Sequence, residues 1–175
     1  MRSKIDGLGG HNVPMHLTAR HEFSAPCDRV YAMSTDPVFL DQACRDLGAL
    51  SQTVEVVPGD GATTRVSMVA ETVPALRTLA GGTLTIGQEL TWGPAVPDGS
   101  RTGRMFIKLA GLPVTLDAEV SLAPAASGCT VDYSGELVVA VPLLGPALEK
   151  QATPFVTETL DAQQASGNRW LAEHP

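Results

Sequence analysis

The sequence predicts a single α+β domain in which seven strands form an antiparallel sheet that packs against one long C-terminal helix. Two observations lead to this prediction. Seven strand-like segments occupy most of the chain, and several of them alternate strictly between apolar and polar residues. One long helical segment, residues 143–172, then closes the chain. A helix that follows a run of strands must bury its apolar side against the sheet. The concave space between sheet and helix is a natural apolar pocket.

The first strand and two short helices form the N-terminal part of this arrangement. Residues 15–23 alternate cleanly, as expected for a strand with one buried face. Pro26 then suits the first position of a helix over residues 26–35. The Asp36-Pro37 pair ends that helix, because the residue before a proline disfavours helical geometry. A second short helix is expected over residues 37–47.

Six further strands are predicted before the last helix. Strict alternation joined by short turns is typical of an antiparallel sheet with one solvated face. Residues 71–83 do not fit a strand, and their apolar Leu76 and Leu79 indicate either a gate at the pocket mouth or packing that caps the sheet. Pro154 should kink or split the final helix. The six strand segments are residues 50–57, 62–70, 84–92, 104–109, 113–122 and 129–141.

The composition of the chain limits the kinds of partner that the protein can bind. The 175 residues suit one domain, and the net charge of −7 argues against binding to nucleic acid or to anionic membranes. No apolar run approaches the ~20 residues that span a bilayer. Residues 1–14 are Gly-rich and carry no apolar signal segment, so we expect a disordered leader followed by a domain over residues 15–172.

No metal site, cofactor or disulfide framework is predicted. The three cysteines are far apart and form no CxxC motif, which favours reduced thiols in a cytoplasmic protein. Cys129 is expected to act as a small apolar residue. His16 and His21 lie an odd number of residues apart and therefore face opposite sides of a regular strand. No Gly-rich phosphate-binding loop precedes a helix.

Several sequence motifs resemble the START-like, or helix-grip, superfamily, which includes Bet v 1-like and polyketide cyclase-like proteins. The stretch FSAPCDRVYAMSTDPVFL, residues 23–40, resembles the opening of those chains. The later pieces ELTWGP, AGLPV and VPLLGPALEK resemble an uncharacterised subgroup. The resemblance implies a helix-grip fold, in which a curved, seven-stranded antiparallel sheet wraps around the long C-terminal helix and two short helices close one end. It also implies binding of hydrophobic small molecules or lipids in most members and enzymatic activity in a minority.

If every apolar strand face points at the helix, three polar side chains point inward too: His21, Gln88 and Tyr133. Each has an alternative structural interpretation. His21 can bond to a neighbouring backbone group, Gln88 can bond to the irregular segment 71–83, and the Tyr133 hydroxyl can reach the surface. The apolar lining of the predicted cavity is Leu17, Ala19, Val66, Met68, Ile86, Leu90, Ile107, Leu116, Val131 and Phe155.

Three functions are consistent with this pattern. The first is a carrier, sensor or sequestering module that holds an apolar small molecule or lipid, with no catalytic residues. The second is a cyclase- or hydrolase-type enzyme that uses His21 or Tyr133 as an acid or base. The third is a protein-interaction module with a collapsed cavity. The sequence favours the first because it contains no catalytic constellation, and it does not indicate the oligomeric state.

Overall fold

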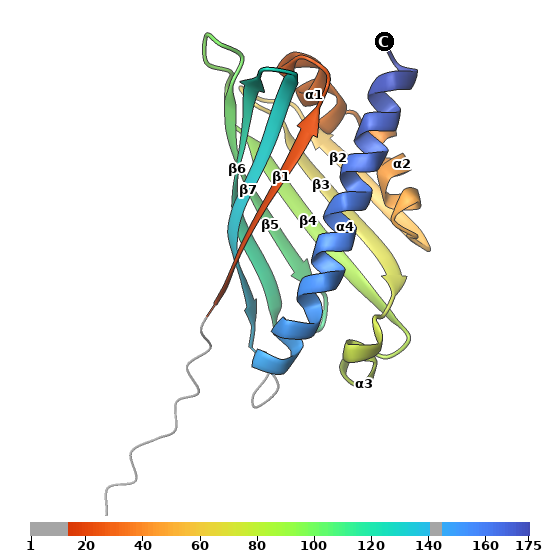
Figure 1. Cartoon of the computed structure of the whole chain (residues 1–175). Coiled ribbons are helices and arrows are strands. Elements are labelled where there is room, and N and C mark those ends of the chain that lie inside the picture. Colours follow the sequence, from red (N-terminus) through yellow and green to blue (C-terminus); the bar gives the residue numbers. More distant parts are fainter. Residues whose placement is uncertain (1–13, 141–144) are drawn as a thin grey trace, which may run out of the picture.

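A computed structural model describes residues 14–140 and 145–175; the side chains of residues 75, 145–153 and 155 are outside this description. The seven strands form one antiparallel sheet in the order β1-β7-β6-β5-β4-β3-β2 (Figure 1). The elements are β1 (Met15–Phe23), α1 (Cys27–Ser34), α2 (Pro37–Asp46), β2 (Ser51–Val57), β3 (Thr63–Glu71), η1 (Pro74–Leu76), α3 (Arg77–Ala80), β4 (Thr83–Trp92), β5 (Arg101–Leu109), β6 (Val114–Ala125), β7 (Gly128–Val139) and α4 (Gly145–Glu173).

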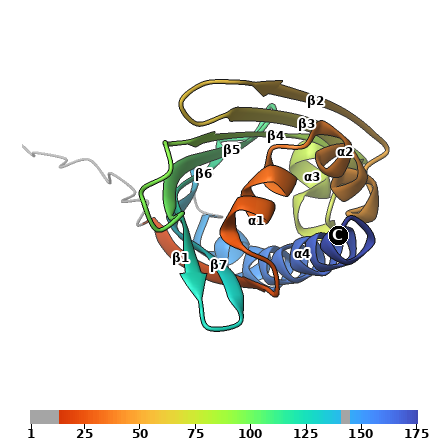
Figure 2. The ribbon, with the colours of Figure 1, turned by 90° about the horizontal axis from the view of Figure 1, so that it is seen from above.

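The sheet curls around α4, which confirms the predicted fold class. Viewed from one end, the strands form an incomplete ring, and α4 runs along the open side between β1 and α2 (Figure 2). Helix α1 lies across one end of the ring, and η1 and α3 lie at the other end (Figures 1 and 2). The concave face of the sheet is therefore enclosed by α4 on its side and by short helices at its ends.

Small residues on the inner face permit this curvature. A Cβ atom on Gly135 of β7 would lie 2.4 Å from the Asp117 backbone oxygen and 2.5 Å from the Ala118 Cβ atom of β6. Atoms cannot approach this closely, so a residue with a side chain would push the two strands apart. Gly135 thus lets β7 bend tightly against β6.

The main hydrophobic core fills the end of the molecule beneath α1 and α2. It contains Val30 and Met33 of α1 together with Val120 and Leu122 of β6, each almost fully buried. A smaller cluster lies toward the opposite end, where Leu76 of η1 packs with Leu137 and Val139. Leu76 therefore contributes to packing, one of the two roles expected for it.

Several predicted features differ from the structure, among them the end of β6, which lies at Ala125 and not at residue 122. Helix α4 continues through Pro154, so the proline does not split it. Strand β5 begins at Arg101, three residues before the predicted start, because Arg101 and Gly103 still pair with β6. The predicted leader lies almost entirely within residues 1–13, outside the described residues.

The expectation of three reduced cysteines was wrong. A disulfide joins Cys27, the first residue of α1, to Cys129 of β7, with the two Cα atoms 5.2 Å apart. Cys44 is buried and free. The two partners are 102 residues apart in sequence, so only the fold brings them together. Disulfides persist in oxidising compartments and are rare in the cytosol. The cytoplasmic location expected from the sequence stays a prediction.

Candidate functional site

The strand register places the predicted strand residues of the site on one face of the sheet. Directly paired residues of neighbouring strands share a face. The pairs that link these positions are Ala19 with Tyr133, His21 with Val131, Val66 with Gln88, Met68 with Ile86, Gln88 with Ile107, Ile107 with Leu116, and Leu90 with Met105. Leu17 pairs with Gly135 on the same face. Phe155 belongs to α4, but its side chain is outside the described residues.

These inward positions fall into two groups by exposure. His21, Leu90 and Val131 are buried in or beside the main core. The other nine remain only half-buried, although they face the inside of the curved sheet: Leu17, Ala19, Val66, Met68, Ile86, Gln88, Ile107, Leu116 and Tyr133. The inner wall is therefore tightly packed beneath α1 and at Leu137 and Val139 of the smaller cluster, and more loosely packed at these nine positions.

Tyr133 is largely surrounded by other residues but keeps some solvent-accessible surface. Burial raises the pKa of its phenol well above the usual value near 10. The side chain nevertheless retains accessible surface. Among the described residues, its hydroxyl has no hydrogen-bond partner.

His21 links the sheet to the last helix. Its ring hydrogen-bonds to the backbone of Leu160 in α4. The Nε2 atom is buried with no described partner, which leaves Nδ1 as the ring nitrogen that faces the Leu160 carbonyl. Desolvation lowers the pKa of His21, partly offset by the Leu160 bond and by the charge of Asp161. His21 is therefore neutral near pH 7, with an unused acceptor at Nε2.

Gln88 contrasts with a second inward glutamine. Gln52 of β2 donates a 2.9 Å hydrogen bond to Asp41 of α2, which satisfies its amide locally. Gln88 lies in the middle of β4, half-buried, with no described side-chain partner. The predicted bond from Gln88 to segment 71–83 is not among the described hydrogen bonds.

Charged residues are excluded from the inner face with one exception. By register, every Asp, Glu, Lys and Arg of the seven strands lies on the outer face apart from Arg101. Outer-face pairs such as Arg104 with Asp117 link neighbouring strands. Arg101 lies near the α1 end, where its guanidinium stacks 3.7 Å above the Tyr31 ring and donates to the Gly93 carbonyl. From Val156 onward, the charged residues of α4 are all exposed.

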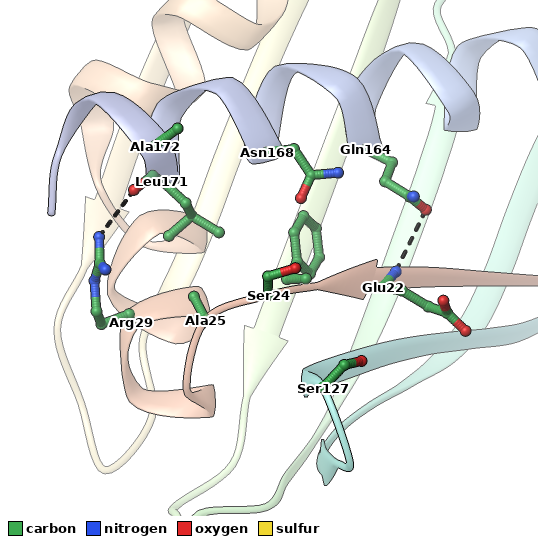
Figure 3. A pocket seen from close by; sticks show the side chains of 10 residues that line it. Glu22, Ser24, Ala25, Arg29, Ser127, Gln164, Asn168, Leu171 and Ala172 are labelled. Carbon is green, nitrogen blue, oxygen red and sulfur yellow. Dashed lines mark hydrogen bonds between the residues drawn. The ribbon is translucent and has the colours of Figure 1, made fainter.

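Two surface grooves lie near the C-terminal end of α4, away from the predicted site. The larger, of about 550 Å³, runs between α4, the β1–α1 connection and the β6–β7 turn (Figure 3). Gln164 accepts a 3.4 Å bond from the Glu22 amide across it. Arg29 donates to the Leu171 and His174 carbonyls at the end of α4. These contacts attach the helix end to β1 and α1.

The smaller groove, of about 300 Å³, separates α2 from α4. There Asp46 accepts hydrogen bonds from Ser166 and Arg169. The hydrogen bond from Ser166 makes the largest contribution to the lowered pKa of the Asp46 carboxyl group. Neither groove is lined by any of the thirteen predicted site residues. Their polar groups are largely used for joining α4 to the rest of the protein.

Within the described ranges, no cluster of three or more His, Cys, Asp or Glu side chains is positioned to hold a metal ion. None of the helices described has the length and apolar character needed to cross a bilayer.

Sequence reasoning missed part of the inner wall. Six further apolar residues share its face and are half-buried: Met15, Val54, Val56, Ala70, Leu109 and Val114. The same two-residue alternation that identified the others marks these positions. The Cys27–Cys129 pair had no such local signal.

The fold is similar to that of several solved proteins. A START superfamily protein from Mycobacterium smegmatis aligns with a TM-score of 0.58 and 12% identity, over 90% of this chain and 98% of that one. An uncharacterised protein from Rhizobium leguminosarum gives 0.58 and 17%, over 90% and 96% of the two chains. Norcoclaurine synthase from Thalictrum flavum, solved with dopamine and hydroxybenzaldehyde, gives 0.54 and 17%, over 100% and 98%.

These likenesses establish the START-like fold, and at such low identity they establish the fold alone. No curated protein matches the sequence. Residues 18–171 match the family described as "Protein of unknown function (DUF2505)". The match covers most of the chain, so this protein belongs to that family, and its fold is START-like.

Proposed function

We propose that this protein binds an apolar small molecule or lipid between its curved sheet and α4, as a carrier, sensor or sequestering module. The observation that carries the proposal is the half-buried state of nine inward-facing side chains on an enclosed concave face. Fully packed core residues lose nearly all of their accessible surface, as Leu90 and Val131 do. Side chains that keep surface inside a fold line a space large enough to admit a probe the size of water.

The START-like fold supports the same proposal, because norcoclaurine synthase, which has a similar fold, was solved in complex with the small molecules dopamine and hydroxybenzaldehyde. The inner wall also has the composition of a small-molecule site, with many apolar side chains and a few polar ones. Gln88 and Tyr133 supply polar groups on strands β4 and β7, which are separated by two other strands.

Native mass spectrometry of the freshly purified protein tests the proposal directly. A bound compound should add a discrete mass that is lost on denaturation. Uptake of the uncharged dye Nile red provides a second measurement, because its emission rises in apolar surroundings. The proposal predicts saturable dye binding at one site.

A pair of neighbouring substitutions on β1 supplies a matched control. Ala19→Phe should fill the space beside Tyr133 and abolish dye binding. Thr18→Phe places the same side chain on the outer face and should leave dye binding unchanged. Val66→Phe on β3 is a second filling variant if Ala19→Phe does not fold. Dye binding that survives both filling variants would contradict an internal site, and no dye binding by the wild type would support the collapsed-cavity alternative.

An enzyme of the cyclase or hydrolase type is the second candidate. It is favoured by the contact between His21 and Tyr133, whose ring centroids are 5.0 Å apart. The fold likeness to norcoclaurine synthase is also consistent with catalysis. Acid–base catalysis needs two polar groups within about 3 Å of the reacting atoms. Turnover of the co-purified compound, lost in Tyr133→Phe but not in Thr18→Phe, would favour the enzyme.

A further inference from the structure

The distribution of charge restricts what the internal site can hold. The inner wall of the sheet carries no charged side chain apart from Arg101. Arg101 is already engaged with the Tyr31 ring and the Gly93 carbonyl at the α1 end. His21 cannot supply a cation near pH 7, because desolvation keeps it neutral.

We infer that the internal site takes an uncharged, mostly apolar molecule that carries a hydroxyl or carbonyl group, and that it rejects ionised carboxylates and phosphates. The inference rests on the proposed function. An ion moved from water into an apolar interior loses its hydration, and the loss is recovered only if an opposite charge or several hydrogen bonds replace the water. No cation on the described inner wall is free to do so.

Neutral polar groups on the same wall match the polar end of such a molecule. The Tyr133 hydroxyl can donate and accept, and the Gln88 amide can do both. Neither has a described side-chain partner. An alcohol, ketone or phenol can satisfy one of these groups without leaving any charge unpaired.

A matched pair of probes tests the inference. 1-Decanol and decanoate have the same carbon chain and differ in the charge of the end group at pH 7.5. Each is titrated against the protein loaded with Nile red. We expect decanol to displace the dye at a concentration at least about tenfold lower than the concentration of decanoate that is needed. A tenfold difference in affinity corresponds to much less free energy than the burial of an unpaired charge costs.

Substitution of Gln88 tests whether a cation on the inner wall reverses the preference between the two probes. Gln88→Lys places a cation on the inner wall and should reverse the preference toward decanoate. Gln88→Met keeps the length of the side chain without charge and should retain the preference for decanol. Both variants are checked by melting temperature, and the wild-type ratio decides the question even if Gln88→Lys does not fold.

The outcomes separate the two proposals. Displacement by decanol alone supports both. Equal displacement by the two probes, with saturable dye binding, overturns the inference about charge and leaves the binding function intact. Absence of dye binding in the wild type overturns the binding function itself.

Discussion

The rings of His21 and Tyr133 meet edge to face on the inner wall, with centroids 5.0 Å apart, yet they differ in how they are held. His21 bonds to the backbone of α4 and is almost fully buried. Tyr133 keeps accessible surface and a hydroxyl without a described partner. The two residues, grouped together by the sequence, therefore have different expected roles. We expect His21 to join the sheet to the helix and Tyr133 to be the residue that a ligand can contact.

His21→Leu should increase the stability of the ligand-free protein. The substitution removes one hydrogen bond, worth a net ~0.5–1.5 kcal/mol, but it also removes a buried unpaired acceptor that costs ~1–3 kcal/mol. Leu160 lies inside α4, where a helical amide can still reach its carbonyl. We expect the free energy of unfolding in urea to rise by ~1 kcal/mol. His21→Gln keeps the polar atoms and should give no gain. A loss of more than ~1 kcal/mol in His21→Leu would mean that Nε2 has a partner such as a trapped water.

Tyr133→Phe should weaken ligand binding and leave the stability of the protein nearly unchanged. Its hydroxyl makes no described hydrogen bond, so the free energy of unfolding should change by less than ~1 kcal/mol. If the hydroxyl contacts the ligand, the affinity for decanol should fall by a factor of ~3–10, the value of one hydrogen bond. Urea denaturation and dye displacement measure the two quantities. A large loss of stability with unchanged affinity would make Tyr133 a structural residue.

Burial of His21 should make stability depend on pH in a defined window. Its pKa is lower in the folded protein than the unfolded value of about 6.5. The unfolded chain therefore binds the proton more readily, and the free energy of unfolding falls as pH decreases below ~6.5, at no more than ~1.4 kcal/mol per pH unit. Above that pH, His21 does not make the free energy of unfolding depend on pH.

The variant His21→Leu serves as the control for this window. Its stability advantage over the wild type should widen between pH 7.5 and pH 5.5 in urea denaturation. Carboxylates with lowered pKa values, such as Asp117 beside Arg104, start to lose their contribution only near pH 4. Parallel curves for the two proteins would show that His21 is protonated equally when folded and unfolded.

The disulfide should stabilise the fold through the large loop that it closes. A bond across 102 residues typically contributes ~2–4 kcal/mol. Dithiothreitol should therefore lower the urea midpoint of the wild type and leave Cys27→Ala/Cys129→Ala unchanged. The denatured, unreduced protein should expose one reactive thiol, that of Cys44. Three reactive thiols would mean that the bond does not form under the conditions of purification.

Alternation along the strands predicted the sheet and its inner face, because a period of two residues is a local property of the sequence. The last helix was predicted from the helical composition of residues 143–172. The inward positions of Gln88 and Tyr133 follow from the same period. Local patterns cannot give the depth of a residue or contacts between distant segments. The bond from His21 to Leu160 and the Cys27–Cys129 pair both depend on the fold, and neither left a sequence signal.

Close packing of α4 on the sheet can be tested at Gly167. A Cβ atom there would lie 2.8 Å from the Phe23 ring and 3.2 Å from the Met33 methyl group. Gly167→Ala gains ~1 kcal/mol of helix propensity, but overpacking of this kind costs ~1–3 kcal/mol. We expect a net loss of stability in urea denaturation. Phe23→Leu should relieve the clash, so the double variant should lose less than the sum of the two single changes. A gain in stability from Gly167→Ala alone would mean that α4 can move away from Phe23 without cost.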